Sequence, residues 1–177
     1  MAMALLASPS WGYKQEDLDK LAAINTCQEC DLAGADLHLA YLREADLREA
    51  NLEKANLEKA NLEKAILTKA NLAGADLRGT VLGVAFLPLA DLREADLERV
   101  DLSHASLRGA NLTGANLERA NLEKADLAGA DLAGADLRGA VLTGAVLRDA
   151  KIDFADFTKA KFCNTVMPDG QRIFKDC

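Results

Sequence analysis

The sequence has few aromatic residues, which make up 5% of the 177 residues although hydrophobic residues make up 50%. Most of this apolar content is 33 Ala and 30 Leu, whereas Val, Ile, Phe and Met together give only 18 residues. A globular core of this size ordinarily uses such larger or β-branched side chains for volume and shape. The chain must therefore bury something other than an ordinary mixed core.

Other absences exclude whole classes of protein. With 12 Gly and 3 Pro, the chain cannot follow the Gly-X-Y pattern of collagen. No apolar stretch approaches 18 residues and 28% of residues are charged, so we expect no membrane insertion. Apolar residues recur too regularly for intrinsic disorder. A net charge of −7 argues against nucleic acid as a partner, because few phosphates could be neutralised.

The sequence does contain a repeat with a period of five. From Leu32 to Phe162, 27 consecutive centres spaced five residues apart hold Leu or, near the carboxyl end, Ile or Phe. From Ala35 onward, Ala stands two residues before each centre, except at Thr80 and Val100. The residue just before each centre is usually Asp or Asn. The unit is therefore Ala-(Asp/Asn)-Leu-X-X.

A period of five fits neither a helix nor a strand. In a helix, successive Leu residues would lie about 140° apart and would be spread around the surface. A backbone that turns a corner every five residues instead brings every Leu and Ala inside. Four such sides form a square coil of about 20 residues, and coils stacked about 4.8 Å apart satisfy one another's backbone hydrogen bonds. The period predicts an all-β solenoid.

In this pattern the chain resembles the pentapeptide repeat family and is similar to its cyanobacterial and chloroplast-lumen members. The resemblance covers residues 30–164 and implies a right-handed quadrilateral parallel β-helix. Twenty-seven units correspond to about seven coils and a rod roughly 30 Å long. Inside it, one ladder of Leu and one of Ala would leave little room for aromatic side chains.

An open coil exposes its apolar interior, so both ends of the rod need a cap. Residues 13–24 read as a short amphipathic helix with Leu18, Leu21, Ala22 and Ile24 on one face. We expect this α-helical cap to lie across the first coil. The division predicted here is residues 1–29 for the amino-terminal segment and capping helix, and 30–164 for the β-helix.

Residues 165–177 form the predicted carboxyl-terminal cap. A turn signal stands at residues 168–170, which read Pro-Asp-Gly. Met167, together with Ile173 or Phe174, is available to cover the last coil.

Four cysteines flank the repeats, Cys27 and Cys30 at the entrance and Cys163 and Cys177 at the exit. A Cys-x-x-Cys motif can be half a zinc site or a redox pair, but zinc needs four ligands and the other cysteines lie a rod's length away. We expect two local disulfides, one at each end, with four reduced thiols as the alternative. Similar Cys-x-x-Cys-Asp-Leu and Met-Pro-Asp-Gly ends in cyanobacterial and lumenal members support the disulfides.

Disulfides would favour an oxidising compartment, the thylakoid lumen or a periplasm, over the cytoplasm. Residues 1–7 are apolar and resemble the end of a signal peptide, but they lack a basic region and are too few for a complete one. Two interpretations therefore stay open, a precursor whose signal peptide has been trimmed and a cytoplasmic protein.

The outward-facing positions hold no recognisable catalytic chemistry. Ser and Thr have no partnered His, no phosphate-binding loop is present, and no His, Asp or Glu cluster has metal-ligand spacing. We therefore predict no enzymatic activity, no cofactor and no metal.

Acidic residues gather at the position before each Leu. Stacking every 20 residues brings Asp36, Asp76, Asp96, Asp136 and Asp156 into one acidic stripe, diluted by Asn. The simple interpretation is that Asp and Asn stabilise the turn through side-chain hydrogen bonds to the backbone. The alternative is DNA mimicry, as in family members that bind and protect DNA gyrase, although neighbouring rows of Lys and Arg argue against it.

A second outward feature interrupts the polar pattern. Apolar residues replace polar ones on two adjoining sides, namely Ile66, Val81, Val84, Phe86, Pro88 and Leu89. Such a patch more often marks a contact than an accident, although tolerated drift of the repeat is the alternative. The sequence therefore predicts a structural or protein-interaction scaffold, either monomeric or weakly self-associating, with an unidentified protein partner. The alternative function is a DNA-mimic inhibitor or protector of an enzyme such as gyrase.

Overall fold

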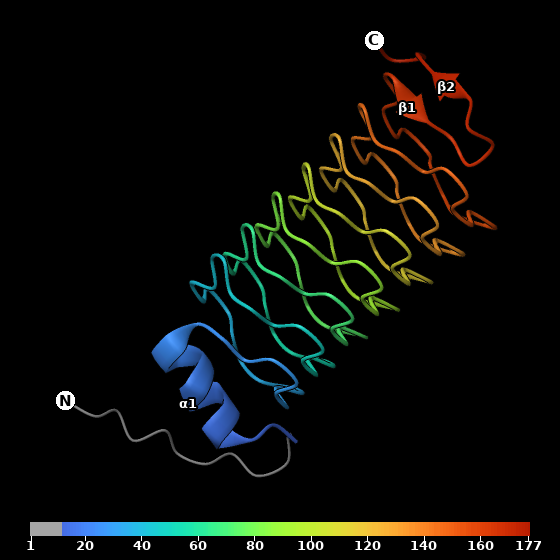
Figure 1. Ribbon diagram of the computed structural model, residues 1–177. Coiled ribbons are helices and arrows are strands. Elements are labelled where there is room, and N and C mark those ends of the chain that lie inside the picture. Colours follow the sequence, from blue (N-terminus) through green and yellow to red (C-terminus); the bar gives the residue numbers. More distant parts are fainter. Residues whose placement is uncertain (1–11) are drawn as a thin grey trace.

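The computed structural model describes residues 12–177, so the apolar residues 1–7 and the question of a signal peptide lie outside it. The chain forms a rod of stacked coils, with helix α1 (Gln15–Ile24) at the amino-terminal end. Strands β1 (Thr165–Val166) and β2 (Arg172–Ile173) lie at the other end (Figure 1). In the described part of the chain, no helix is long and apolar enough to cross a membrane.

Neighbouring coils pair through parallel β-bridges between residues twenty positions apart. Asn56 pairs with Asp76 and Asp76 with Asp96, and the series runs from Thr26 to Val166. Each pairing is a single bridge and not a continuous strand, because the chain turns again after five residues. Four pentapeptides therefore complete one coil, as the period predicts.

Each side of a coil satisfies its backbone groups in the same way. Leu57 N–H donates to Asp76 O at 2.7 Å in the next coil, and Ala60 N–H closes a turn by donating to Leu57 O at 2.9 Å. The third residue of that turn, Lys59, has φ of +56°. Positive φ at this position is the mark of a type II turn and normally favours Gly or Asn.

The interior consists of the two predicted ladders. Leu57, Leu77 and Leu97 are 0% exposed, and so are Ala55, Ala75 and most of their counterparts. Thr80, one of the two exceptions to Ala, is also buried, and its Oγ1 donates to Leu57 O at 2.7 Å. The hydroxyl is tolerated in the interior because it has a partner.

Helix α1 lies against the first coil. Leu21 is buried and Leu18 packs against the core, as predicted. Lys14 N–H, just before the helix, donates to Asp31 O at 2.9 Å. The predicted apolar face was partly wrong, because Ala22 and Ile24 are exposed. The helix ends at Asn25, which has φ of +53°, and Ile24 in its last turn is 62% exposed.

The carboxyl-terminal tail folds back as an antiparallel pair, in which Thr165 lies opposite Ile173. A turn at Pro168 and Asp169 joins the two strands. Of the residues predicted to cover the last coil, Met167 and Ile173 pack against the core, whereas Phe174 is exposed.

Candidate functional site

The predicted apolar patch lies at one corner of the rod, halfway along it. Val84 is 53% exposed, Phe86 49% and Leu89 59%, and Val81 is exposed too. Ile66 pairs directly with Phe86 across the coils, which places it beneath the patch. Ile66 and Pro88 are half-buried. The structure thus brings together residues of sides 81–85 and 86–90 with Ile66 of the coil before. These six residues are called the mid-rod patch below.

Two members of the mid-rod patch have an unfavourable backbone conformation. Val84 and Leu89 both have φ of +60°, in the turn position where nine other units have Gly and sixteen have other residues, none of them β-branched. Left-handed backbone costs an L-residue about 1–2 kcal/mol, and a β-branched side chain is least suited to it. The repeat therefore holds two apolar side chains outward at positions where Gly would be less costly.

The Leu89 side chain contacts the next coil at Gly109. A Cβ atom added to Gly109 would lie 2.9 Å from Leu89 Cδ2. The Leu89 side chain therefore packs on the bare backbone of Gly109. This contact pre-arranges part of the mid-rod patch before any partner binds.

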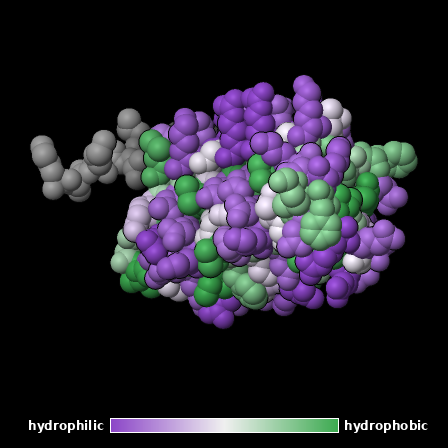
Figure 2. Space-filling model, turned by 90° about the horizontal axis from the view of Figure 1, so that it is seen from above, coloured by the Kyte–Doolittle hydropathy of each residue, from purple (hydrophilic) through white to green (hydrophobic). Residues whose placement is uncertain are grey.

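Charged groups surround the mid-rod patch and already have partners. Below it, Lys69 Nζ lies 3.1 Å from Glu49 Oε1. Above it, Arg108 Nη1 lies 2.9 Å from Asp126 Oδ2. An apolar centre with a polar rim is the usual composition of a protein–protein interface. In the view from above, most of the visible surface is hydrophilic, with hydrophobic areas between the polar ones (Figure 2).

The acidic stripe has a structural use along the rod. Asp76 Oδ1 accepts a hydrogen bond from Arg78 N–H at 3.1 Å, and Asp136 Oδ1 accepts one from Arg138 N–H at 3.0 Å. Asn56, which stands between two acidic residues of the stripe, donates from Nδ2 to Asp36 Oδ1 at 3.0 Å. These bonds support the turn interpretation of the Asp and Asn positions.

Arginine two residues after an aspartate neutralises much of this acidity, a pairing that the sequence analysis missed. Arg78 Nε lies 2.8 Å from Asp76 Oδ1, and its guanidinium lowers the pKa of that carboxyl. Arg138 lowers the pKa of Asp136 in the same way. Outside the stripe, the hydrogen bonds from Arg48 lower the pKa of Asp46 to about 2. The signal was present in the sequence as Asp-Leu-Arg, which places both charged side chains on one wall.

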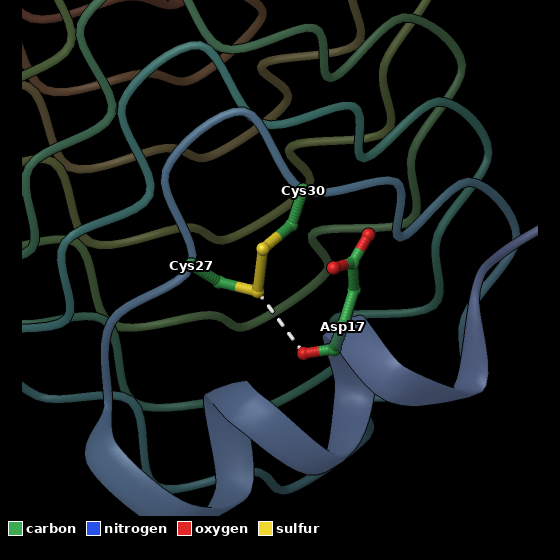
Figure 3. Close-up of side chains that lie close together, drawn as sticks. All are labelled: Asp17, Cys27 and Cys30. Atoms are coloured by element: carbon green, nitrogen blue, oxygen red, sulfur yellow. Dashed lines mark hydrogen bonds between the residues drawn. A yellow bond between two sulfur atoms is a disulfide. The ribbon is translucent and has the colours of Figure 1, made fainter.

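The cysteines lie at the two ends of the rod. The structure contains disulfides between Cys27 and Cys30 and between Cys163 and Cys177. Cys27 and Cys30 are buried in the interior positions of the first coil, where Leu and Ala stand in later coils. Their sulfur atoms face α1, and Cys27 Sγ lies 3.0 Å from the carbonyl oxygen of Asp17 (Figure 3).

This corner also brings together three groups of the kinds that bind metals. One ligand atom each of Asp17, Cys27 and Cys30 lies within 4.8 Å of the others. The disulfide occupies both sulfur atoms, and Asp17 Oδ2 accepts a hydrogen bond from Asp31 N–H at 2.8 Å. In this state the group fastens the helix to the first coil and offers no thiolate to a metal.

Comparison with known protein families identifies the same five-residue repeat. The family model for pentapeptide repeats matches four overlapping or adjacent stretches, at residues 26–58, 45–83, 90–129 and 125–164. No curated protein matches the chain.

Several solved structures are similar to this chain. HetL, a pentapeptide repeat protein involved in heterocyst differentiation regulation from the cyanobacterium Nostoc sp. strain PCC 7120, is 39% identical, with 84% of this chain and 74% of HetL covered and a TM-score of 0.44. A pentapeptide repeat protein of the Arabidopsis thaliana thylakoid lumen is 26% identical, with 73% and 77% covered and a TM-score of 0.29. Full-length QnrB1, a plasmid-mediated fluoroquinolone resistance protein, is 20% identical, with 78% and 82% covered and a TM-score of 0.44. The chain belongs to the pentapeptide repeat family, whose members form right-handed quadrilateral β-helices.

Proposed function

We propose that this chain is a non-catalytic scaffold that acts by binding another protein. In this proposal, residues 1–29 contribute a capping helix, residues 30–164 a rod of about seven coils, and residues 165–177 the second cap. The interior is filled by Leu and Ala, so any function belongs to the outer walls or the ends. Members of this family are generally structural or interaction proteins without enzymatic activity.

The mid-rod patch is the surface that we propose binds the partner. The observation that carries this proposal is the exposure of Val84, Phe86 and Leu89 on two adjoining sides of the rod. None of these side chains fills the interior, and Val84 and Leu89 occupy positions where Gly would stabilise the rod. Adjoining exposed apolar side chains of this kind more often mark a contact surface than chance variation.

The test is capture of partner proteins from an extract of the source organism by the immobilised full chain. The double substitution Phe86→Ser and Leu89→Ser should reduce the captured partner at least about tenfold. The matched control is Glu94→Ser with Arg99→Ser, which changes the same coil on its other two sides. Equal capture by both variants would contradict the proposal.

In the second form of this proposal, the protein self-associates, and the mid-rod patch binds a second copy of this chain. Sedimentation equilibrium separates the two forms. If two copies meet there, the wild-type mass rises with concentration and the Phe86→Ser, Leu89→Ser variant stays monomeric. If a different protein binds there, both remain monomeric.

DNA mimicry is the weaker candidate. It requires an uncompensated row of carboxylates to meet a basic groove. In the acidic stripe, Asp76 and Asp136 are each paired with arginine, and Asp36 with the amide of Asn56. Addition of the protein to a gyrase supercoiling assay tests this candidate, since a mimic must inhibit or protect at stoichiometric concentration and a scaffold must not.

We also propose that the protein works in an oxidising compartment, the thylakoid lumen or a periplasm. The proximity of Cys27 to Cys30 and of Cys163 to Cys177 supports this. Titration of thiols in the unfolded, unreduced protein should find none. Four free thiols would refute both the disulfides and the compartment.

A further inference from the structure

The last coil of the rod leaves its backbone open on two of its four sides. One coil earlier, Leu132 N–H donates to Lys151 O and Gly134 N–H to Asp153 O, both at 2.8 Å. The equivalent donors in the last coil are the N–H groups of Ile152, Phe154, Phe157 and Lys159. Within residues 12–177, none of these four donates a hydrogen bond to another backbone carbonyl.

The tail accepts hydrogen bonds from the backbone, or donates them to it, only on the other two sides of this coil. Leu147 N–H donates to Val166 O at 2.7 Å, and Asp149 N–H donates to Pro168 O at 3.0 Å. Phe162 N–H donates to Asp176 Oδ2 at 2.9 Å. The carbonyls of Ala150 and Ala155 face the same open edge and accept no backbone hydrogen bond from the described residues. The open sides therefore present a row of alternating donors and acceptors.

Apolar surface lies beside this row. Ile152 and Phe157 are half-buried, whereas Leu132 and Leu137 one coil below are fully buried. Phe154 is 97% exposed and has φ of +59°, a costly arrangement for an aromatic residue. In the view from above, which faces the carboxyl-terminal end of Figure 1, hydrophobic atoms gather at the right of the molecule (Figure 2).

A cavity adjoins the first of the open sides. This cavity has a volume of about 400 Å³, and a separate cavity of about 460 Å³ lies at the amino-terminal end of the rod. Helix α1 already lines the amino-terminal one through Leu18 and Leu21. The carboxyl-terminal cavity lies between Ile152 and the tail and is lined by Ile152, Met167, Pro168, Asp169, Gln171 and Ile173. It is large enough for one apolar side chain.

We propose that an extended segment of a partner protein adds to this end of the rod as one further rung, parallel to residues 151–160. Alternating N–H and C=O groups at an open edge are matched by extended backbone, whereas the backbone groups of a helix are already bonded to one another. The partner segment continues the pattern of the rod, with one apolar side chain in the cavity over Ile152 and a second over Phe157.

The geometry of the repeat also specifies the sequence of this segment. Two apolar residues lie five positions apart, and a small residue lies three positions after the first, because each Ala of the rod follows a Leu by three. The recognised pattern is therefore apolar-x-x-small-x-apolar over two five-residue sides. This surface is separate from the mid-rod patch, so either can fail without the other.

A synthetic peptide with the sequence of residues 131–140, which contains this pattern, is the probe. The target is the full oxidised chain labelled with ¹⁵N. In the free chain the amides of Ile152, Phe154, Phe157 and Lys159 should exchange rapidly with solvent. With the peptide at about 1 mM these amides should shift and exchange at least about tenfold more slowly.

A control peptide with Pro at both Asp positions lacks the two N–H groups that would donate to the carbonyls of Ala150 and Ala155, and it should have no effect. Phe154→Ser should weaken binding of the first peptide about fivefold, whereas Phe86→Ser in the mid-rod patch should leave it unchanged. The proposal is overturned if the four amides do not respond, or if both peptides act equally. It is also overturned if the free chain already protects these amides by dimerising.

Discussion

Asn56 Nδ2 donates a hydrogen bond to Asp36 Oδ1 at 3.0 Å, across the twenty residues that separate neighbouring coils. The same contact joins Asn116 to Asp96 at 2.9 Å. In each case an amide stands where a second carboxylate would repel the first. The Asn residues of the repeat thus allow acidic turn residues to stack about 4.8 Å apart.

Asn56→Asp should lower the thermal midpoint of unfolding by about 3 °C at pH 7, which corresponds to about 1 kcal/mol. The new carboxylate can still support its own turn, so the loss comes from repulsion by Asp36 and Asp76. Repulsion between carboxylates raises their pKa values in the folded state. The loss of stability is therefore present at pH values above these pKa values and disappears below about pH 4, where the carboxyl groups are protonated. Denaturation at pH 7 and pH 3.5 checks this, and an equal loss at both would contradict it.

The pKa of Asp46 should measure about 2 by carboxyl carbon NMR and should return toward its usual range in Arg48→Ala. Arg48 holds it down through a hydrogen bond between Nε and Oδ1 at 2.8 Å. Because the folded pKa is lowered, the stabilisation is present above about pH 4 and is lost as the pH falls through 2. Arg48 is 49% exposed, so solvent screening keeps the contribution of this pair to stability small. An unchanged pKa in Arg48→Ala would show that the pair has no influence.

Val84→Gly should stabilise the rod by about 1 kcal/mol and raise the thermal midpoint by about 2–4 °C. The substitution relieves a β-branched residue at φ of +60° and removes an exposed apolar side chain. If the mid-rod patch binds a partner, the same variant should bind it more weakly. A variant that is more stable and binds equally well would leave Val84 without a role in binding.

The double substitution Cys163→Ser and Cys177→Ser should loosen the tail without unfolding the rod. A disulfide that closes a loop of about 15 residues contributes about 3 kcal/mol, and solenoids unfold locally from their ends. The amide of Asp176, which donates to Phe162 O at 2.8 Å, should therefore exchange about 100-fold faster. Amides of interior coils such as Leu97 serve as the control and should not change.

The regular part of the fold could be predicted because every unit meets copies of itself. A period of five places Leu57 beneath Leu77 whatever lies outside, so the interior ladders and the pairing of residues twenty apart follow from the sequence. The mid-rod patch follows for the same reason, since Ile66 and Phe86 are twenty residues apart.

The ends could be predicted only in outline, because each contact there occurs once and no repeat specifies it. Exposure of Ile24 depends on how α1 leaves its last turn, and the open edge over Ile152 depends on how far the tail reaches. The Asp-Leu-Arg pairs and the positive φ of Val84 were missed although the sequence contained their signals. Asp76 and Arg78 stand on either side of Leu77, so the pairing is seen only when both positions of one unit are considered together.

The central claim is that the mid-rod patch contacts a protein, and site-specific photo-crosslinking tests it most directly. A photoreactive amino acid is placed at position 84 or 89, or at the equivalent positions 94 and 99 on the other sides of the same coil. Irradiation in the source organism should give a defined crosslinked species from positions 84 and 89 and none from 94 and 99. Equal crosslinking from all four positions, or none from 84 and 89, would contradict the account.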